Sequence, residues 1–250
     1  MEIELLAKLI MGSERIVVFT GAGVSLESGI DLRTMWSEYD LYDLSYKNFL
    51  GNPESRKKQW KLLSEKEHII EAAPNQTHYT LAEMDKLGKL DCVITENIDN
   101  LLQKAGVSES KIIEFYGNLN RAKCLSCGKR VPMKEVLQKV KKGIEVPDCP
   151  DCSGLLKPDA IFFPDELPEE TVRTAIDRSQ NCDLFISLGS SLATYPPAYL
   201  IGYAKTGGAT LAIVGVTPTL FDKDAVVVIQ ENVGETMAGV MEKLRERMPF

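Results

Sequence analysis

The stretch from residue 15 to residue 28 constrains the fold more than any other part of the chain. Residues 15–20 form a short apolar run rich in β-branched side chains, which stops at Gly21-Ala22-Gly23. Residues 24–28 then read as the start of a helix. A strand, a glycine turn and a helix in this order open a nucleotide-binding βα unit.

Further buried strands are predicted by apolar runs along the rest of the chain. They lie at residues 91–95, 111–115, 183–188, 209–214 and 225–229. Helices are expected at residues 1–10, after Pro74 and at residues 234–248, and helical character also marks residues 35–71. Apolar strands separated by helices are typical of a parallel sheet covered on both faces. The predicted fold is therefore α/β with a Rossmann-like sheet.

Composition excludes some classes of function. The 250 residues are 44% hydrophobic, enough to bury a substantial core, and the formal net charge is -7. A net negative charge argues against a general affinity for nucleic acid or for an anionic membrane. No apolar run approaches the roughly 20 residues of a spanning helix. Residues 1–10 lack the features of a secretory signal, so we expect a cytoplasmic protein.

Four cysteines stand in two pairs in a lysine-rich segment that breaks the strand and helix rhythm. The pairs are Cys124–Cys127 and Cys149–Cys152, and Gly128 and Gly154 follow them closely. Such pairs can present four thiolates tetrahedrally to Zn²⁺, and four cysteines leave no open position for catalysis. We therefore predict a structural zinc site whose metal supplies folding energy. Redox pairs or spare thiols are the alternative.

Glycine-rich or polar segments follow the predicted strands at three places. They are the loop from Gly21 to Ser25, the segment from Thr95 to Asn100, and the segment from Gly189 to Leu192. Ligand sites form at the carboxyl ends of parallel strands, and Gly23 would let a pyrophosphate approach the backbone. Taken singly, each segment is equally well explained as an ordinary turn.

Taken together, the motifs resemble those of sirtuins. The glycine loop, Thr95-Glu-Asn-Ile-Asp99, the paired cysteines, Lys157-Pro-Asp-Ala-Ile-Phe-Phe163 and Gly189-Ser-Ser-Leu192 occur in the order seen in that family, over residues 10 to 245. The resemblance implies a Rossmann-like NAD-binding domain at 1–118 and 157–250, with a helical insert or cofactor loop at 35–73. It implies a zinc module at 119–156, with NAD and an acyl-lysine peptide in the cleft between the two.

The family's functional residues are carried over by position. The resemblance implies that Gly21, Ala22, Gly23 and Ser25 form the NAD phosphate loop. Asp31 and Arg33 match an Asp-Phe-Arg pattern that also binds the cofactor, and Asn97 and Asp99 match residues of the nicotinamide pocket. The resemblance also implies a second phosphate and ribose contact at Gly189, Ser190 and Ser191, and a peptide-binding strand at Ala160, Ile161, Phe162 and Phe163. The catalytic candidates are Arg33, Glu96, Asn97, Asp99 and Tyr116.

The chain departs from the sirtuin pattern around this site. Tyr116 stands where the family has its histidine, Glu96 replaces a glutamine, and Gly215 replaces an asparagine on the adenosine ribose. Pro164-Asp165 replaces a Gly-Glu pair, and Leu32 replaces the phenylalanine of the Asp-Phe-Arg pattern. The proline that usually precedes the aspartate of this pattern, here Asp31, is missing. Several changes around one site indicate altered chemistry.

The tyrosine bears most directly on mechanism. Tyrosine titrates near 10 and is protonated at neutral pH, whereas loss of a general base costs about 10²–10⁴-fold. Nicotinamide cleavage needs no such base, so we expect ADP-ribosyl transfer from NAD to an acyl-lysine or other protein acceptor, with deacylation impaired. His68 and His78 are expected to be structural. The alternatives are a deacylase that uses Glu96 or Tyr116 as its base, and a catalytically silent module that binds NAD or ADP-ribose.

Overall fold

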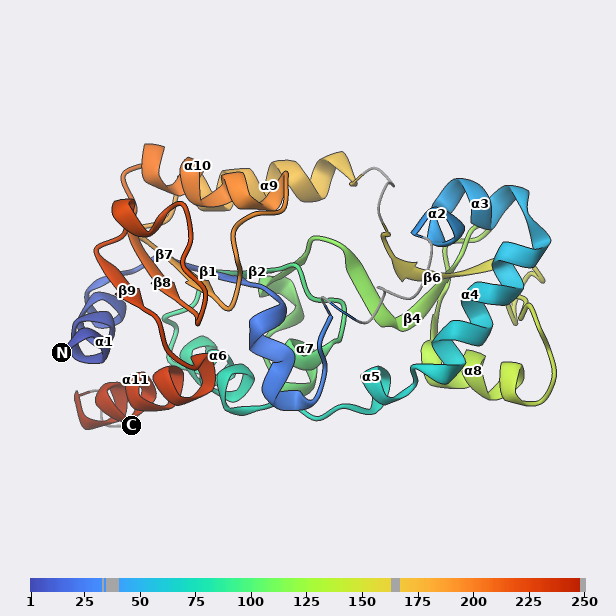
Figure 1. The fold of residues 1–250 in the computed structure, drawn as a ribbon, viewed down its shortest axis with the longest axis horizontal. Coiled ribbons are helices and arrows are strands. Elements are labelled where there is room, and N and C mark those ends of the chain that lie inside the picture. Colours follow the sequence, from blue (N-terminus) through green and yellow to red (C-terminus); the bar gives the residue numbers. More distant parts are fainter. Residues whose placement is uncertain (33, 35–40, 163–166, 248–250) are drawn as a thin grey trace.

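The computed structural model describes residues 1–32, 34, 41–162 and 167–247. Two sheets of unequal size lie in two lobes, and the chain passes between the lobes several times (Figure 1). The predicted site residues Arg33 and Phe163, and the departure at Pro164-Asp165, lie outside the described residues. No helix in the described ranges is long and apolar enough to cross a membrane.

The larger lobe is built on a six-stranded parallel sheet. Its strand order is β3 (Ile112–Glu114), β2 (Cys92–Thr95), β1 (Ile16–Thr20), β7 (Leu184–Leu188), β8 (Thr210–Val214) and β9 (Val227–Ile229). Every neighbouring pair is parallel. The six predicted strands are thus confirmed in place and direction. β1, β2 and β7 are buried throughout, which is why their sequences are continuously apolar rather than alternating.

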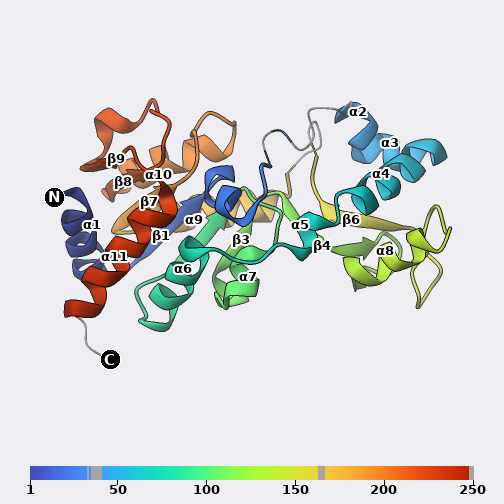
Figure 2. The ribbon, with the colours of Figure 1, turned by 60° about the horizontal axis from the view of Figure 1, so that its bottom comes forward.

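Helices cover both faces of this sheet (Figures 1 and 2). Side chains of β1 alternate between the two layers: Ile16 and Val18 join one hydrophobic cluster, and Val17 and Phe19 join the other. The first cluster takes in α1 (Glu2–Gly12), α6 (Gln76–Lys86), α7 (Leu101–Ala105) and α11 (Val233–Arg247), and the second takes in α9 (Glu169–Gln180) and α10 (Leu200–Thr206). The helices predicted near both ends of the chain and after Pro74 are confirmed.

The smaller lobe contains a three-stranded antiparallel sheet, β5 (Arg130–Pro132), β4 (Gly117–Cys124) and β6 (Leu156–Ala160). The helix α8 (Met133–Lys141) packs beside it, together with α2 (Leu41–Leu44), α3 (Tyr46–Gly51), α4 (Pro53–Glu65) and α5 (His68–Glu71). One cluster joins Phe49 and Trp60 to Leu137 and Leu156. The cysteine segment therefore shares an apolar core with the helices of residues 41–71.

Short 3₁₀ turns complete the described elements. They are η1 (Ala22–Ser28), η2 (Glu109–Lys111), η3 (Pro197–Tyr199) and η4 (Asp222–Asp224). The segment predicted as a helix start after the glycine turn is thus a 3₁₀ helix. It ends at Gly29, whose φ of 77° is the left-handed conformation that glycine adopts most easily.

Candidate functional site

The topology predicts a ligand site at the carboxyl ends of the strands of the large sheet. From β1 the chain continues to β2 and β3 on one side, whereas β7, β8 and β9 extend from the other side of β1. The order therefore reverses between β1 and β7. Open α/β sheets bind ligands at such a switch point, beyond the carboxyl ends of the strands.

A cavity of about 290 Å³ lies at this edge. The loops after β1, β2, β7 and β8 supply eight of the predicted cofactor residues to its wall: Ala22, Gly23, Glu96, Asn97, Gly189, Ser190, Ser191 and Gly215. The structure thus brings these residues together from four separate segments.

Other residues of the wall were not predicted. They are Leu26, Glu27, Leu32, Thr194, Val216, Thr217, Asn232 and Val233. Val216 and Thr217 follow β8, and Asn232 follows β9 at the start of α11. Their position just after predicted strands was the available signal, since the same rule identified Asn97 and Ser190.

The glycines of the first loop serve a purpose that was not predicted. A Cβ on Gly23 would lie 2.7 Å from the carbonyl oxygen of Gly189, and one on Gly21 would lie 2.7 Å from the Cα of Ser190. The amides of Gly21 and Gly23 donate to the carbonyls of Leu188 and Gly189, at 3.0 and 2.8 Å. Side chains are therefore excluded by the neighbouring loop. The neighbouring loop thus gives a second reason for a glycine at position 23, and the predicted approach of a pyrophosphate to Gly23 stays a prediction.

A buried chain of hydrogen bonds holds Asn97 in the cavity wall. Its Nδ2 donates to the carbonyl of Gly21 at 3.0 Å and to Ser25 Oγ at 2.9 Å. Ser25 Oγ donates in turn to Asp99 Oδ2 at 2.6 Å, and the Leu101 amide donates to Asp99 Oδ1 at 2.9 Å. Burial raises the pKa of the Asp99 carboxyl. Gly21, Ser25 and Asp99 support the wall without lining it, and Asp31 is also absent from the described wall.

Glu96 follows β2 and forms hydrogen bonds with residues at the carboxyl ends of β1 and β7. Its amide donates to the carbonyl of Thr20 at 3.0 Å, and its Oε2 accepts a hydrogen bond from Ser190 Oγ at 3.0 Å. Burial raises the pKa of the Glu96 carboxyl to about 7, and the Ser190 hydrogen bond partly opposes this shift. Glu96 can therefore exchange a proton near neutral pH.

Tyr116 lies on the link between the two sheets, directly before β4. Its ring meets that of Phe115 edge to face at 5.8 Å, and its carbonyl accepts a hydrogen bond from the Ile161 amide at 2.9 Å. Burial, and then the negative charge of Glu96, raise the pKa of Tyr116 to about 12. The phenol is thus protonated at neutral pH and has no capacity as a base there.

The two histidines of the chain lie away from this site. His78 is part of a capping box at the start of α6, where the Asn75 amide donates to its Nδ1 at 3.2 Å. Burial lowers the pKa of His78 to about 4. His68 begins the short helix α5 in the smaller lobe. Neither histidine lines this cavity or the larger cavity described below, so no imidazole base faces the site.

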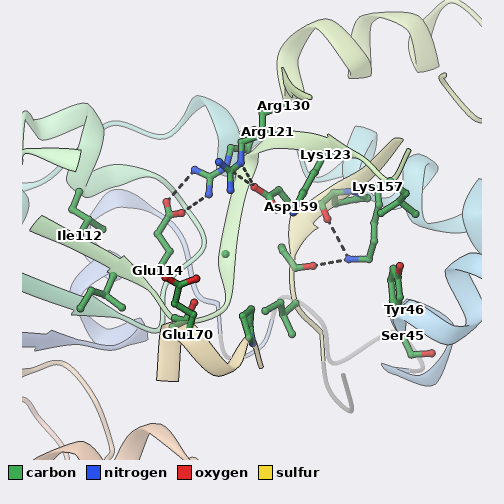
Figure 3. Close-up of a pocket in the computed structure, with 18 of the residues that line it drawn as sticks. Ser45, Tyr46, Ile112, Glu114, Arg121, Lys123, Arg130, Lys157, Asp159 and Glu170 are labelled. Atoms are coloured by element: carbon green, nitrogen blue, oxygen red, sulfur yellow. Dashed lines mark hydrogen bonds and ion pairs between the residues drawn. The ribbon is translucent and has the colours of Figure 1, made fainter. Parts of the chain in front are cut away.

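A second, larger cavity of about 1020 Å³ opens between the lobes (Figure 3). Ala160 and Ile161, predicted to bind a peptide, lie in its wall, whereas Phe162 is buried in the core of the smaller lobe. Lys157 Nζ donates to the carbonyl of Ala160 at 2.8 Å. We name this space the interlobe cleft.

An ion-pair network crosses the wall of the interlobe cleft (Figure 3). Arg121 on β4 pairs with Glu114 on β3, and its Nε donates to Asp159 Oδ2 on β6 at 2.7 Å. Arg130 Nε donates to the same carboxylate oxygen at 2.9 Å. Because Glu114 belongs to the large sheet, Arg121 ties the two lobes together.

The four paired cysteines meet in the smaller lobe. Their sulfurs all lie within 4.8 Å of one another, with Cys124 and Cys152 at 3.5 Å and Cys127 and Cys149 at 3.7 Å. Tetrahedral Zn–S bonds of about 2.3 Å place sulfurs roughly 3.8 Å apart, so the four thiolates fit Zn²⁺. Gly128 has a φ of 75°, as the predicted sharp turn requires.

Comparison with known proteins gives the family. Residues 21–196 match the model of the Sir2 family. The chain belongs to the Sir2 family. An NAD-dependent protein deacylase 2 of Archaeoglobus fulgidus is 36% identical over 98% of this chain and 96% of its own length. An NAD-dependent protein deacetylase 1 of Pyrobaculum aerophilum is 38% identical over 98% of this chain and 95% of its length.

Solved sirtuin structures share the fold over nearly the whole chain. A Sir2 protein with a p53 peptide and NAD⁺ superposes with a TM-score of 0.84 at 34% identity, covering 97% of this chain and 98% of that one. Sir2Tm bound to a propionylated peptide gives a TM-score of 0.83 over the same shares. The resemblance drawn from the motifs is thus confirmed, and this sirtuin comes from a family of enzymes that use NAD.

Proposed function

We propose that this sirtuin cleaves nicotinamide from NAD and transfers ADP-ribose to a protein acceptor, with deacylation impaired. The cavity at the switch point is the proposed NAD site, with Asn97 and the loops at Ala22 and Ser190 as its contacts. Arg33 and Asp31 are proposed to complete it. The acceptor is an acyl-lysine side chain or another nucleophile that enters through the interlobe cleft.

The protonated tyrosine carries the part of the proposal that concerns deacylation. In the sirtuin scheme a histidine takes a proton from a ribose hydroxyl after nicotinamide has left. Tyr116 occupies that position with its pKa raised to about 12, so it cannot take this proton at neutral pH. The expected loss is about 10²–10⁴-fold in that step. Nicotinamide cleavage precedes it and is unaffected.

Two observations support an acyl-lysine protein as the acceptor. Sirtuin structures that resemble this chain contain acetylated or propionylated peptides. In this chain Ala160 ends β6 and Ile161 follows it in the wall of the interlobe cleft. Extended backbone at a sheet edge can pair with a peptide strand by β-augmentation. We therefore propose that residues 160–163 hold the acceptor peptide.

Mass spectrometry of the products tests the proposal. The purified protein is incubated with NAD and an acetyl-lysine peptide, and nicotinamide, peptide mass and free nucleotide are measured. Nicotinamide with an ADP-ribosylated peptide or protein, and an intact acetyl group, is the expected result. Rapid loss of the acetyl group with O-acetyl-ADP-ribose would refute impaired deacylation. Intact NAD across a panel of acceptors would instead favour a silent binding module.

The substitution Tyr116→His provides the matched control. It returns an imidazole to the predicted position of the base, and we expect deacylation to rise by about 10²-fold or more. Tyr116→Phe keeps the ring but removes the phenol. Its transfer rate should equal that of the unmodified chain, because a protonated phenol contributes no base.

A second candidate function has one observation in its favour. Glu96 has a pKa of about 7, which suits a general base, so it could take the ribose proton in place of histidine. The chain would then be a working deacylase. In that case Glu96→Gln would abolish deacetylation while Tyr116→Phe would leave it intact.

A further inference from the structure

Two carboxylates lie in the wall of the proposed NAD cavity. Among the described residues of this wall, the charged side chains are Glu27 and Glu96, and none is a lysine, arginine or histidine. Glu96 is held in place by the hydrogen bond from Ser190 Oγ. The carboxylate therefore stands between the loops that follow β1 and β7.

A carboxylate at this position has two uses when the bond between ribose and nicotinamide breaks. Its negative charge stabilises the positive charge that develops on the sugar. Its oxygen can also take a proton from a water molecule that attacks the anomeric carbon, as carboxylates do in glycoside hydrolysis. The glutamine that the sirtuin pattern has in place of Glu96 carries a neutral amide, which accepts no proton.

We propose that this chain is also an NAD glycohydrolase in which Glu96 is the general base for water. The bond between the ribose C1′ and the nicotinamide nitrogen breaks, and its electron pair leaves with nicotinamide. A new bond forms between C1′ and the water oxygen, while the water proton passes to the Glu96 carboxylate and then to solvent. The products are ADP-ribose, nicotinamide and a proton, so no further reactant is needed.

The surroundings of Glu96 suit this role. Burial places the pKa of its carboxyl at about 7, the range in which a general base is most effective at neutral pH. Tyr116 stays protonated beside it and offers no competing base. The proposal rests on the NAD site of the proposed function but requires no acyl-lysine acceptor.

Incubation of the full chain with NAD alone tests the proposal. Nicotinamide and free ADP-ribose are separated by liquid chromatography and identified by mass spectrometry. We expect equal amounts of both products from the unmodified chain, and a rate about 10²–10⁴-fold lower for Glu96→Gln. The control is Glu109→Gln, which removes an exposed carboxylate from the remote turn η2 and should leave the rate unchanged.

Two further measurements separate chemistry from structure. Calorimetric titration with NAD should give the same affinity for Glu96→Gln as for the unmodified chain, which also shows that the variant is folded. The pH profile of hydrolysis should rise through about pH 7 in the unmodified chain, since Glu96 must be ionised to act, and Glu96→Gln should lack this limb. A packing role for Glu96 would not produce that limb.

The outcomes distinguish this proposal from the proposed function. If nicotinamide appears only when an acceptor is present, the glycohydrolase is refuted and the transferase stands. If Glu96→Gln hydrolyses NAD as fast as the unmodified chain, the role of Glu96 is refuted. Absence of NAD binding by calorimetry would overturn both proposals.

Discussion

Replacement of Arg121 by methionine tests the contact that joins the two lobes. Arg121 on β4 binds Glu114 on β3 and Asp159 on β6, so it connects the large sheet to the small one (Figure 3). Methionine keeps much of the apolar stem but removes the charge. The side chains of Glu114 and Asp159 are only 16% and 18% exposed, so both carboxylates are partly removed from water.

The expected loss of stability depends on the hydrogen bonds that Glu114 and Asp159 keep after the substitution. Removal of one partner from a fully buried ion pair costs about 3–5 kcal/mol. Glu114 keeps hydrogen bonds from Gln103 Nε2 at 2.6 Å and Asn118 Nδ2 at 2.5 Å, and Asp159 keeps Arg130. The retained bonds and the partial exposure reduce the cost, and we expect a loss of about 2 kcal/mol in the free energy of unfolding.

Urea denaturation followed by far-ultraviolet circular dichroism measures this loss. The exposed Arg173 on α9 supplies the control, since Arg173→Met should change the free energy of unfolding by less than about 0.5 kcal/mol. In the double variant Arg121→Met/Glu114→Gln, part of the loss should be recovered, because no unpaired carboxylate then remains at Glu114. A loss below about 0.5 kcal/mol for Arg121→Met, at an unchanged denaturant slope, would refute the reasoning.

The remaining predictions concern the metal, the glycine contact and a buried histidine. Cys124→Ser should lower the zinc content measured by mass spectrometry and destabilise the smaller lobe, as should a strong chelator. Gly23→Ala should weaken NAD binding in calorimetry and lower the melting temperature, because its Cβ meets the Gly189 backbone at 2.7 Å, whereas Gly202→Ala has open space and should be tolerated. The pKa of His78 in the folded protein, about 4, lies below its ordinary value of 6.5. The neutral imidazole therefore contributes its full share to the free energy of unfolding above pH 6.5, and this free energy falls by about 3 kcal/mol as the pH drops to 4. His78→Gln should flatten that dependence in denaturation measured across this range.

The parallel sheet was predictable because its strands are buried on both faces. Every residue of β1 is buried, so its sequence is a nearly continuous apolar run that differs from the more polar segments beside it. The packing of the smaller lobe was not predictable in this way. Trp60 and Leu137 belong to one cluster but are far apart in sequence, and neither segment contains a pattern that predicts this contact. Residues 35–73 were assigned to the Rossmann-like domain, and the shared core leads us to propose that the described helices 41–71 belong with the cysteine module.

The candidate site was predictable to the extent that it follows strand ends. Asn97, Ser190 and Gly215 each lie within two residues of the end of a strand, and all three line the cavity. Glu27 was missed because it lies at the far end of a 3₁₀ turn, where its distance from the strand gives no signal. The steric reason for a glycine at position 23 was also missed. It is the close approach of the Gly189 backbone, and the sequence does not show that the two residues are neighbours.

The departures at Glu96 and Tyr116 are coupled through charge. The carboxylate of Glu96 is one cause of the raised pKa of Tyr116, so it makes the phenol a still poorer base. Removing this charge would lower the pKa of Tyr116 only toward the ordinary value of 10.0 or the higher value that burial sets, and the phenol would remain protonated at neutral pH. Glu96→Gln therefore cannot recruit Tyr116 as a base. A base at position 116 that acts at neutral pH therefore requires a different side chain, such as the histidine of Tyr116→His.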